Sequence, residues 1–221
     1  MTYKETIYKN ALDEINNIYE ESKYNSKVDL FRSQDLITST NSAQMSSKEW
    51  LVETLIPFIS DFKYLNVDLT DILVMGSWYG LTGMILRQHI NNDIKIWNID
   101  SDPDAARYCN SLQRNNSDFD NNVPITDDAM EYYFDRTNTF QLIINTSCEH
   151  MEQEDLQMVL NSKPANTMAC FQSNNYHKEA EHINTHDSLD SFVESLNLAS
   201  VYYKGSMEPS ADFTRYMVIG V

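Results

Sequence analysis

An alternation of short apolar runs with stretches of helical periodicity begins at Ile72 and continues to the end of the chain. This alternation is typical of consecutive βαβ units, in which each helix connects two parallel strands. The apolar runs predict seven strands, at residues 72–75, 94–99, 123–125, 140–145, 167–171, 198–203 and 216–220. Helices are predicted between them at about 80–90, 103–114, 128–134, 153–162 and 187–196. The pattern therefore predicts an α/β protein.

The last two predicted strands are connected by residues 204–212, which show no helical periodicity. Such a connection allows an antiparallel hairpin at one edge of the sheet. Pro103 suits the first turn of a helix, and Asp187 or Ser188 suits a helix N-cap. Residues 66–221 are thus expected to form a Rossmann-like, seven-stranded, mostly parallel sheet with a C-terminal antiparallel hairpin.

Residues 1–65 have a different pattern and predict an N-terminal helical extension. The apolar residues that recur at helical spacing in its first part are Ile7, Leu12, Ile15 and Ile18. A polar stretch follows at 33–47, and Ser-Ser-Lys-Glu at 46–49 resembles a capping box that starts a second helix. The extension is expected either to cover the ligand site as a lid or to act as a cap for stability or dimerisation, which makes an oligomer possible.

Composition narrows the class of protein. A chain of 221 residues with 42% hydrophobic residues can bury one core without disulfides. The formal net charge of −17 repels phosphate backbones and disfavours nucleic acid as a partner. The apolar runs are too short to cross a bilayer, the N-terminus lacks the pattern of a secretory signal, and the three cysteines are widely spaced. These features predict a soluble cytoplasmic protein without a membrane partner.

A glycine turn directly follows the first predicted strand and leads into a helix; residues 76–83 read Gly-Ser-Trp-Tyr-Gly-Leu-Thr-Gly. Glycines let a ligand approach the backbone closely, and the N-terminus of a helix offers unpaired N–H groups. The second predicted strand ends near Asp100, whose carboxylate can accept hydrogen bonds from both hydroxyls of a ribose. The turn and the acid together predict a nucleotide-type cofactor site.

Three other classes of site are disfavoured by the same residues. A dinucleotide dehydrogenase needs glycine where Trp78 stands, because the pyrophosphate must approach the backbone there. The sequence has no Gly-Lys-Ser/Thr of a Walker phosphate loop. Ser77 lacks the Gly-x-Ser-x-Gly elbow of a hydrolase nucleophile.

Several segments in turn resemble the successive motifs of the class I S-adenosylmethionine-dependent methyltransferases. They are residues 72–80, Asp100, 127–129 and 140–150, and the resemblance covers about residues 70–221. It implies S-adenosylmethionine as cofactor, with Gly76 and Gly80 against its methionyl part, Asp100 on the ribose, and Asp128 with Ala129 at the adenine. The cofactor-binding residues implied in full are Gly76, Ser77, Trp78, Gly80, Asp100, Ser101, Asp128, Ala129 and Asn145.

Two positions depart from the family pattern. Trp78 stands where a glycine is usual, and Val74 stands where an acid is common. Because a sulfonium cofactor carries no pyrophosphate, the indole is compatible with it and can lie near the cation. The departures leave open a non-catalytic or regulatory protein that keeps the fold. An enzyme that consumes S-adenosylmethionine by another reaction is a further alternative, because the cofactor site does not dictate which bond breaks.

The activity that the resemblance implies is methyl transfer to an oxygen or nitrogen of a small molecule or a protein. Such transfer requires in-line alignment and, for a protonated acceptor, a base. The candidate catalytic residues are Asn145, Glu149 and His150, with a purely structural role for the last two as an equal alternative. The candidate substrate-binding residues, in a polar segment after the fifth predicted strand, are Asn174, Asn175, Tyr176 and His177.

A metal site is the weaker interpretation of that polar segment. His177, Glu181 and His182 have ligand chemistry, and positions i and i+4 of a helix share a face. No further ligand spacing supports them, so the sequence predicts a loop of hydrogen-bonded polar groups and no metal.

Overall fold

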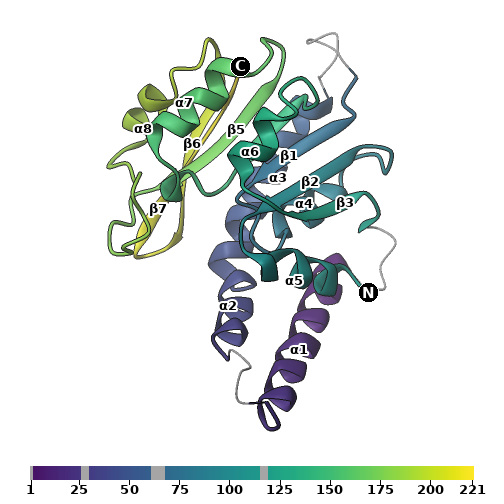
Figure 1. Cartoon of the computed structure of the whole chain (residues 1–221). Helices are drawn as coiled ribbons and strands as arrows, with labels where there is room; N and C mark the ends of the chain where they lie inside the picture. Colours follow the sequence, from purple (N-terminus) through teal and green to yellow (C-terminus); the bar gives the residue numbers. More distant parts are fainter. Residues whose placement is uncertain (1, 26–29, 61–67, 115–118) are drawn as a thin grey trace.

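The computed structural model describes residues 2–25, 30–60, 68–114 and 119–221. They include a seven-stranded sheet in the order β3-β2-β1-β4-β5-β7-β6, with helices on both faces (Figure 1). The strands are β1 (Asp71–Met75), β2 (Lys95–Asp100), β3 (Asn122–Thr126), β4 (Leu142–Asn145), β5 (Met168–Asn174), β6 (Val201–Ser210) and β7 (Phe213–Gly220). The helices are α1 (Tyr3–Ser22), α2 (Phe31–Ser39), α3 (Ser42–Ser60), α4 (Leu81–Arg87), α5 (Pro103–Gln113), α6 (Ala129–Phe134), η3 (Cys148–His150), α7 (Gln153–Ser162) and α8 (Leu189–Leu196). The expected fold is confirmed.

Strand β1 lies inside the parallel part of the sheet. Its Val74 is opposite Asn98 of β2 and Ile144 of β4, and both pairings are parallel. Strand β7 runs antiparallel to β5 and to β6, which forms the expected C-terminal hairpin. Because the strand order reverses between β1 and β4, a crevice opens at the carboxyl ends of these strands, where open α/β sheets bind ligands.

The central strands β1, β4 and β5 bury both of their faces, which explains the nearly continuous apolar sequences of β1 and β4. Ile72 and Val74 pack in one apolar cluster with helices α1 to α5. Leu73 and Met75 point to the other face and pack in a second cluster with α6, α7 and α8. Strand β1 therefore connects two packed layers, and its carboxyl end is held in place from both sides.

The N-terminal helices share the first of these layers. Ile7 of α1 and Leu36 of α2 are fully buried in the same cluster as the strand residues, and Figure 1 shows α1 and α2 extending beyond the sheet. Leu12 is 59% exposed, so its predicted place on the buried face is wrong. The buried stripe of α1 runs instead through Ile7, Ala11 and Ile18, on one narrow face of the helix. The predicted boundary at 65/66 lies outside the described residues.

Helix α3 begins four residues before the predicted capping box. The Asn41 side chain accepts a hydrogen bond of 2.9 Å from the backbone N–H of Gln44 and so caps the helix at Ser42. Ser46 lies inside the helix, where its hydroxyl donates to the carbonyl of Ala43. The polar segment that precedes the predicted start is therefore helical over 31–39 and again from Ser42.

The C-terminal hairpin is longer than predicted. Residues 204–210, expected as a loop, continue β6 to Ser210, because this strand lies at the sheet edge and can expose polar side chains. Strand β5 continues to Asn174, which pairs with Arg215 of β7. The other predicted bounds agree with the structure within three residues. No described helix combines the length and the apolar character that crossing a bilayer requires.

Candidate functional site

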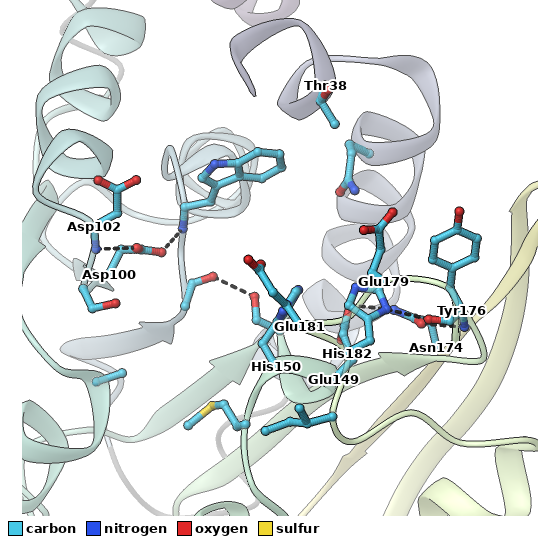
Figure 2. A pocket seen from close by; sticks show the side chains of 18 of the residues that line it. Thr38, Asp100, Asp102, Glu149, His150, Asn174, Tyr176, Glu179, Glu181 and His182 are labelled. Atoms are coloured by element: carbon cyan, nitrogen blue, oxygen red, sulfur yellow. Dashed lines mark hydrogen bonds between the residues drawn. The ribbon is translucent and has the colours of Figure 1, made fainter. Parts of the chain in front are cut away.

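A cavity of about 1070 Å³ lies at the carboxyl ends of the parallel strands. Its walls come from the turn after β1, the ends of β2 and β3, the segment after β4, the loop after β5 and the β6–β7 hairpin. Residues of α2 and α3, including Asp35 and Gln44, also line it. Figure 2 shows Asp100 and Asp102 at one end, and Glu149, His150, His182 and Tyr176 at the other.

The turn after β1 has three residues with positive φ. Gly76 has φ of 56°, Trp78 of 50° and Gly80 of 70°. Gly76 lies beside Ser147, whose hydroxyl donates to the Gly76 carbonyl at 3.0 Å, and a Cβ on Gly76 would be only 2.9 Å from that of Ser147. Glycine is therefore required here for the close approach of the β1 and β4 loops. Both Gly76 and Trp78 line the cavity.

Asp100 is held by two backbone donors at the end of β2. Its Oδ2 accepts from the N–H of Trp78 at 2.7 Å, and its Oδ1 accepts from the N–H of Asp102 at 3.0 Å. Burial raises the pKa of Asp100 above its ordinary value, and these two hydrogen bonds oppose that shift. A carboxylate has about four acceptor positions, so Asp100 keeps capacity for a ligand's hydroxyls.

The predicted adenine residues also line this end of the cavity. Asp128 is exposed and caps α6, because its Oδ1 accepts from the N–H groups of Met130 and Glu131. Ala129 and Ser101 complete this part of the wall. One oxygen of Asp128 therefore has a structural role, and the other, Oδ2, remains for a ligand.

Five predicted site residues do not line the cavity: Ser77, Gly80, Asn145, Asn175 and His177. Asn145 is fully buried, and its side chain bonds to Met151 Sδ and to the N–H of Ser147. Asn175 continues the pairing with Thr214, and His177 lies on the surface beside Asp187. Asn145, Asn175 and His177 therefore make contacts that support neighbouring loops.

A buried ion pair lies under the other end of the cavity. Arg215 Nη1 donates to Glu149 Oε1 at 3.1 Å, and both side chains are less than a tenth exposed. Asn174 Nδ2 donates to the same oxygen at 2.6 Å. The structure thus brings together two predicted residues, Glu149 and Asn174, and adds Arg215, which the sequence did not reveal. Arg215 directly precedes the apolar run at 216–220, and this position is the signal that could have revealed the ion pair. An arginine next to a buried strand is rarely buried without a partner.

Lys48 of α3 faces this ion pair and was also missed. Its Nζ donates to Gln44 Oε1 at 2.8 Å. Burial lowers the pKa of Lys48 to about 7, the positive charge of Arg215 lowers it too, and the Glu149 charge opposes both. The signal in the sequence is a lysine three residues after Met45 and four before Val52, on the buried face of the helix.

Replacing Lys48 with methionine is expected to remove a pH-dependent part of the stability. The unfolded chain releases the lysine proton near pH ~10.4, whereas the folded protein releases it near pH 7. Between these values the unfolded state binds more protons, so the free energy of unfolding of the wild type rises with pH. From pH 7 to pH 9 this single group contributes a rise of about 2 kcal/mol.

Urea unfolding of wild type and Lys48→Met at both pH values measures this contribution. The difference between the two proteins isolates the lysine, because the buried cysteines and tyrosines are common to both. The same pH dependence in both proteins would show that Lys48 keeps its ordinary pKa.

Ion pairs of Arg32 join helix α2 to the start of α5, at the Asp100 end of the cavity. Arg32 Nη1 contacts Asp102 Oδ2 at 2.5 Å and its Nε contacts Asp104 Oδ2 at 3.2 Å. Tyr79, from the glycine turn, donates to Asp35 of α2 at 3.4 Å. The expected lid role of the N-terminal extension remains a prediction, and these contacts are the ones that would have to break if the helix moves.

Carboxylates dominate the lining of the cavity. Besides Asp100 and Glu149, they come from the loop after β5, as Glu179 and Glu181, and from the start of α7, as Asp155. Among the described lining residues the only lysine or arginine is Arg215, and Glu149 pairs with it. The field in the cavity therefore favours cationic ligands.

Solved structures of several methyltransferases share this architecture, although no family model and no curated protein matches the sequence. Fibrillarin from Aeropyrum pernix, solved with natively bound S-adenosyl-L-methionine, aligns with a TM-score of 0.51 and 13% identity, over 70% of this chain and 67% of that one. The N-methyltransferase NodS from Bradyrhizobium japonicum aligns with a TM-score of 0.54 and 12% identity, over 77% and 95%. The bifunctional kinase-methyltransferase WbdD aligns with a TM-score of 0.55 and 14% identity, over 80% of this chain but 38% of that one.

The sheet order and these alignments indicate the same fold. The chain has the fold of the class I S-adenosylmethionine-dependent methyltransferases, including the antiparallel β7 between β5 and β6.

Proposed function

We propose that this chain is an S-adenosylmethionine-dependent methyltransferase that transfers a methyl group to an oxygen or nitrogen of a small molecule or a protein. The observation that carries the proposal is the Asp100 carboxylate, which lies at the carboxyl end of β2 in the wall of the cavity. The methyltransferase fold and the cofactor bound to fibrillarin of the same fold support it.

The residues at this end of the cavity fit the cofactor. Asp100 has acceptor capacity for two ribose hydroxyls, and Gly76 presents bare backbone where a side chain would collide with Ser147. Asp128 and Ala129 lie where the adenine would be held, at the start of α6. The surrounding carboxylates suit the positive charge of a sulfonium. When bound, the cofactor supplies an activated methyl group.

The other end of the cavity would bind and orient the acceptor. His150 is exposed, lines the cavity and follows β4, so its imidazole can accept a proton from an acceptor hydroxyl or amine. Glu149 is tied to Arg215 and Asn174, which gives it a positioning role. Helix α2 and Gln44 of α3 would exclude water above the reacting groups. The acidic lining favours a neutral or cationic acceptor.

Calorimetric titration with S-adenosylmethionine and S-adenosylhomocysteine tests the cofactor assignment, with NAD as the control ligand. Wild type is expected to bind both sulfur compounds but not NAD. Replacing Asp100 with alanine is expected to weaken binding about 100-fold, because two charge-assisted hydrogen bonds of roughly 1.5 kcal/mol each are lost.

Asp135→Ala is the matched control. Asp135 follows α6, is exposed and does not line the cavity, so its loss should leave affinity unchanged. Equal affinity of the wild type and Asp100→Ala would refute the ribose assignment. Binding without formation of S-adenosylhomocysteine over a broad acceptor panel would favour the regulatory protein, and other cleavage products would favour a different reaction of the cofactor.

A further inference from the structure

Three potential metal ligands converge at the acceptor end of the cavity. Glu149 and His150 belong to η3 after β4, and His182 belongs to the loop after β5. One ligand atom from each residue lies within 4.8 Å of the others, and Figure 2 shows the three side chains at the same end of the pocket. The two imidazole rings meet edge to face, with centroids 4.7 Å apart. Two segments 32 positions apart in the chain thus supply the cluster.

The Glu149 carboxylate has one oxygen in use and one without a partner. Oε1 accepts from Arg215 and Asn174, whereas Oε2 is buried and has no hydrogen-bond partner among the described residues. The residue is only 3% exposed and lines the cavity. A buried carboxylate oxygen without a partner costs free energy, and a bound cation would remove that cost.

His182 is oriented as metal-binding histidines commonly are. Its Nδ1 lies 2.7 Å from the backbone carbonyl of Tyr176. A carbonyl can only accept, so this contact places the proton of the neutral ring on Nδ1 and leaves the lone pair of Nε2 available. A hydrogen bond from the second ring nitrogen to a backbone carbonyl is the usual support of a metal-bound imidazole.

We propose that Glu149, His150 and His182 bind one divalent transition metal ion at the acceptor end of the cavity. Two imidazoles with one carboxylate favour Zn²⁺ or Fe²⁺ over Mg²⁺ and Ca²⁺, which prefer oxygen ligands. Three protein ligands leave coordination positions open toward the cavity. Glu179 and Glu181, in the cavity wall, add to the negative field that attracts the ion.

With the ion bound, His150 would serve as a ligand and not as the base, and the ion would act on the acceptor. An acceptor oxygen or nitrogen bound at an open position would be held in place, and its pKa would fall so that it releases its proton to water before the transfer. This role rests on the proposed methyl transfer, whereas the binding of the ion does not. Metal binding and cofactor binding can therefore be tested separately.

The test titrates Co²⁺, as a spectroscopic substitute for Zn²⁺, into protein without a polyhistidine tag and without S-adenosylmethionine. Wild type is expected to bind one Co²⁺ with visible d–d absorption, which one equivalent of Zn²⁺ abolishes and excess Mg²⁺ does not. His150→Ala and His182→Ala should each weaken Co²⁺ binding by at least about 100-fold, since loss of a ligand exceeds the 10–100-fold typical of lost supporting contacts.

His177→Ala is the matched control, because His177 belongs to the same loop but lies outside the cavity. It should bind Co²⁺ as the wild type does. His150 is exposed, so its alanine variant is expected to fold, and an unchanged thermal melt verifies this. Unchanged Co²⁺ affinity in folded His150→Ala, or no spectral change in the wild type, would overturn the proposal. Cofactor binding lost in Asp100→Ala with Co²⁺ binding intact would separate the two sites.

Discussion

Arg215→Met is expected to lower the free energy of unfolding by about 3–5 kcal/mol, the range seen when one partner of a buried ion pair is removed. Arg215 is the charged partner of Glu149, and it also donates to the carbonyl of Thr146 at 3.3 Å. Without the guanidinium, the Glu149 carboxylate stays buried with only Asn174 as a donor. Urea unfolding at pH 7 measures the loss, with a chelator present so that no metal ion replaces the missing charge.

The double variant Glu149→Gln/Arg215→Met separates the buried charge from lost packing. Glutamine keeps an acceptor for Asn174 but carries no charge. The double variant should therefore be more stable than Arg215→Met alone. If the two variants are equally unstable, packing of the arginine stem explains the loss and the ion pair does not.

The second large effect is expected for Gly80→Ala, which should destabilise the protein by about 2–4 kcal/mol. Gly80 has φ of 70° and precedes α4, a conformation that costs other residues roughly 1 kcal/mol. In addition, an added Cβ would lie 2.4 Å from Cys109 Sγ, in a core position that is 1% exposed. Overpacking of this kind costs about 1–3 kcal/mol. Thermal or urea unfolding of the variant gives the value.

A Cys109→Ala background tests the steric part of this prediction. Removing the sulfur removes the close contact, whereas the strain from positive φ remains. Gly80→Ala should therefore cost less in that background, by at least about 0.5 kcal/mol, the lower limit of coupling between touching residues. Strictly additive losses would show that the turn shifts and that Cys109 does not constrain it.

The order of elements and the Asp100 end of the cavity follow from local patterns in the sequence. The apolar runs predicted all seven strands, and the turn at Gly76 and the acid Asp100 lie at neighbouring strand ends because consecutive parallel strands place their carboxyl ends at one sheet edge. Local patterns predicted the ends of strands less accurately where polar residues continue a strand, as in β5 and β6. The extension of β5 to Asn174 and of β6 to Ser210 depends on partners in β7 that no short window contains.

Of the four residues predicted to bind substrate, Asn174 and Tyr176 line the cavity, and Asn175 and His177 do not. His177, five positions before His182, points to the surface. The direction of a loop side chain depends on which backbone groups the loop bonds to, and the sequence does not contain that information. The sequence also did not reveal the contacts of Lys48 and Arg215, because these residues belong to α3 and β7, which are far apart in the chain.

The sequence by itself determined the class of fold, the position of the glycine turn and the acid at the end of β2, because these depend on periodicity and on spacing within one βαβ unit. Only the tertiary structure decided that Glu149 pairs with Arg215, that His182 meets His150, and that Arg32 joins α2 to Asp102. These contacts join residues far apart in sequence. Their geometry is set by the packing of whole layers against the sheet, which acts only once the chain has folded.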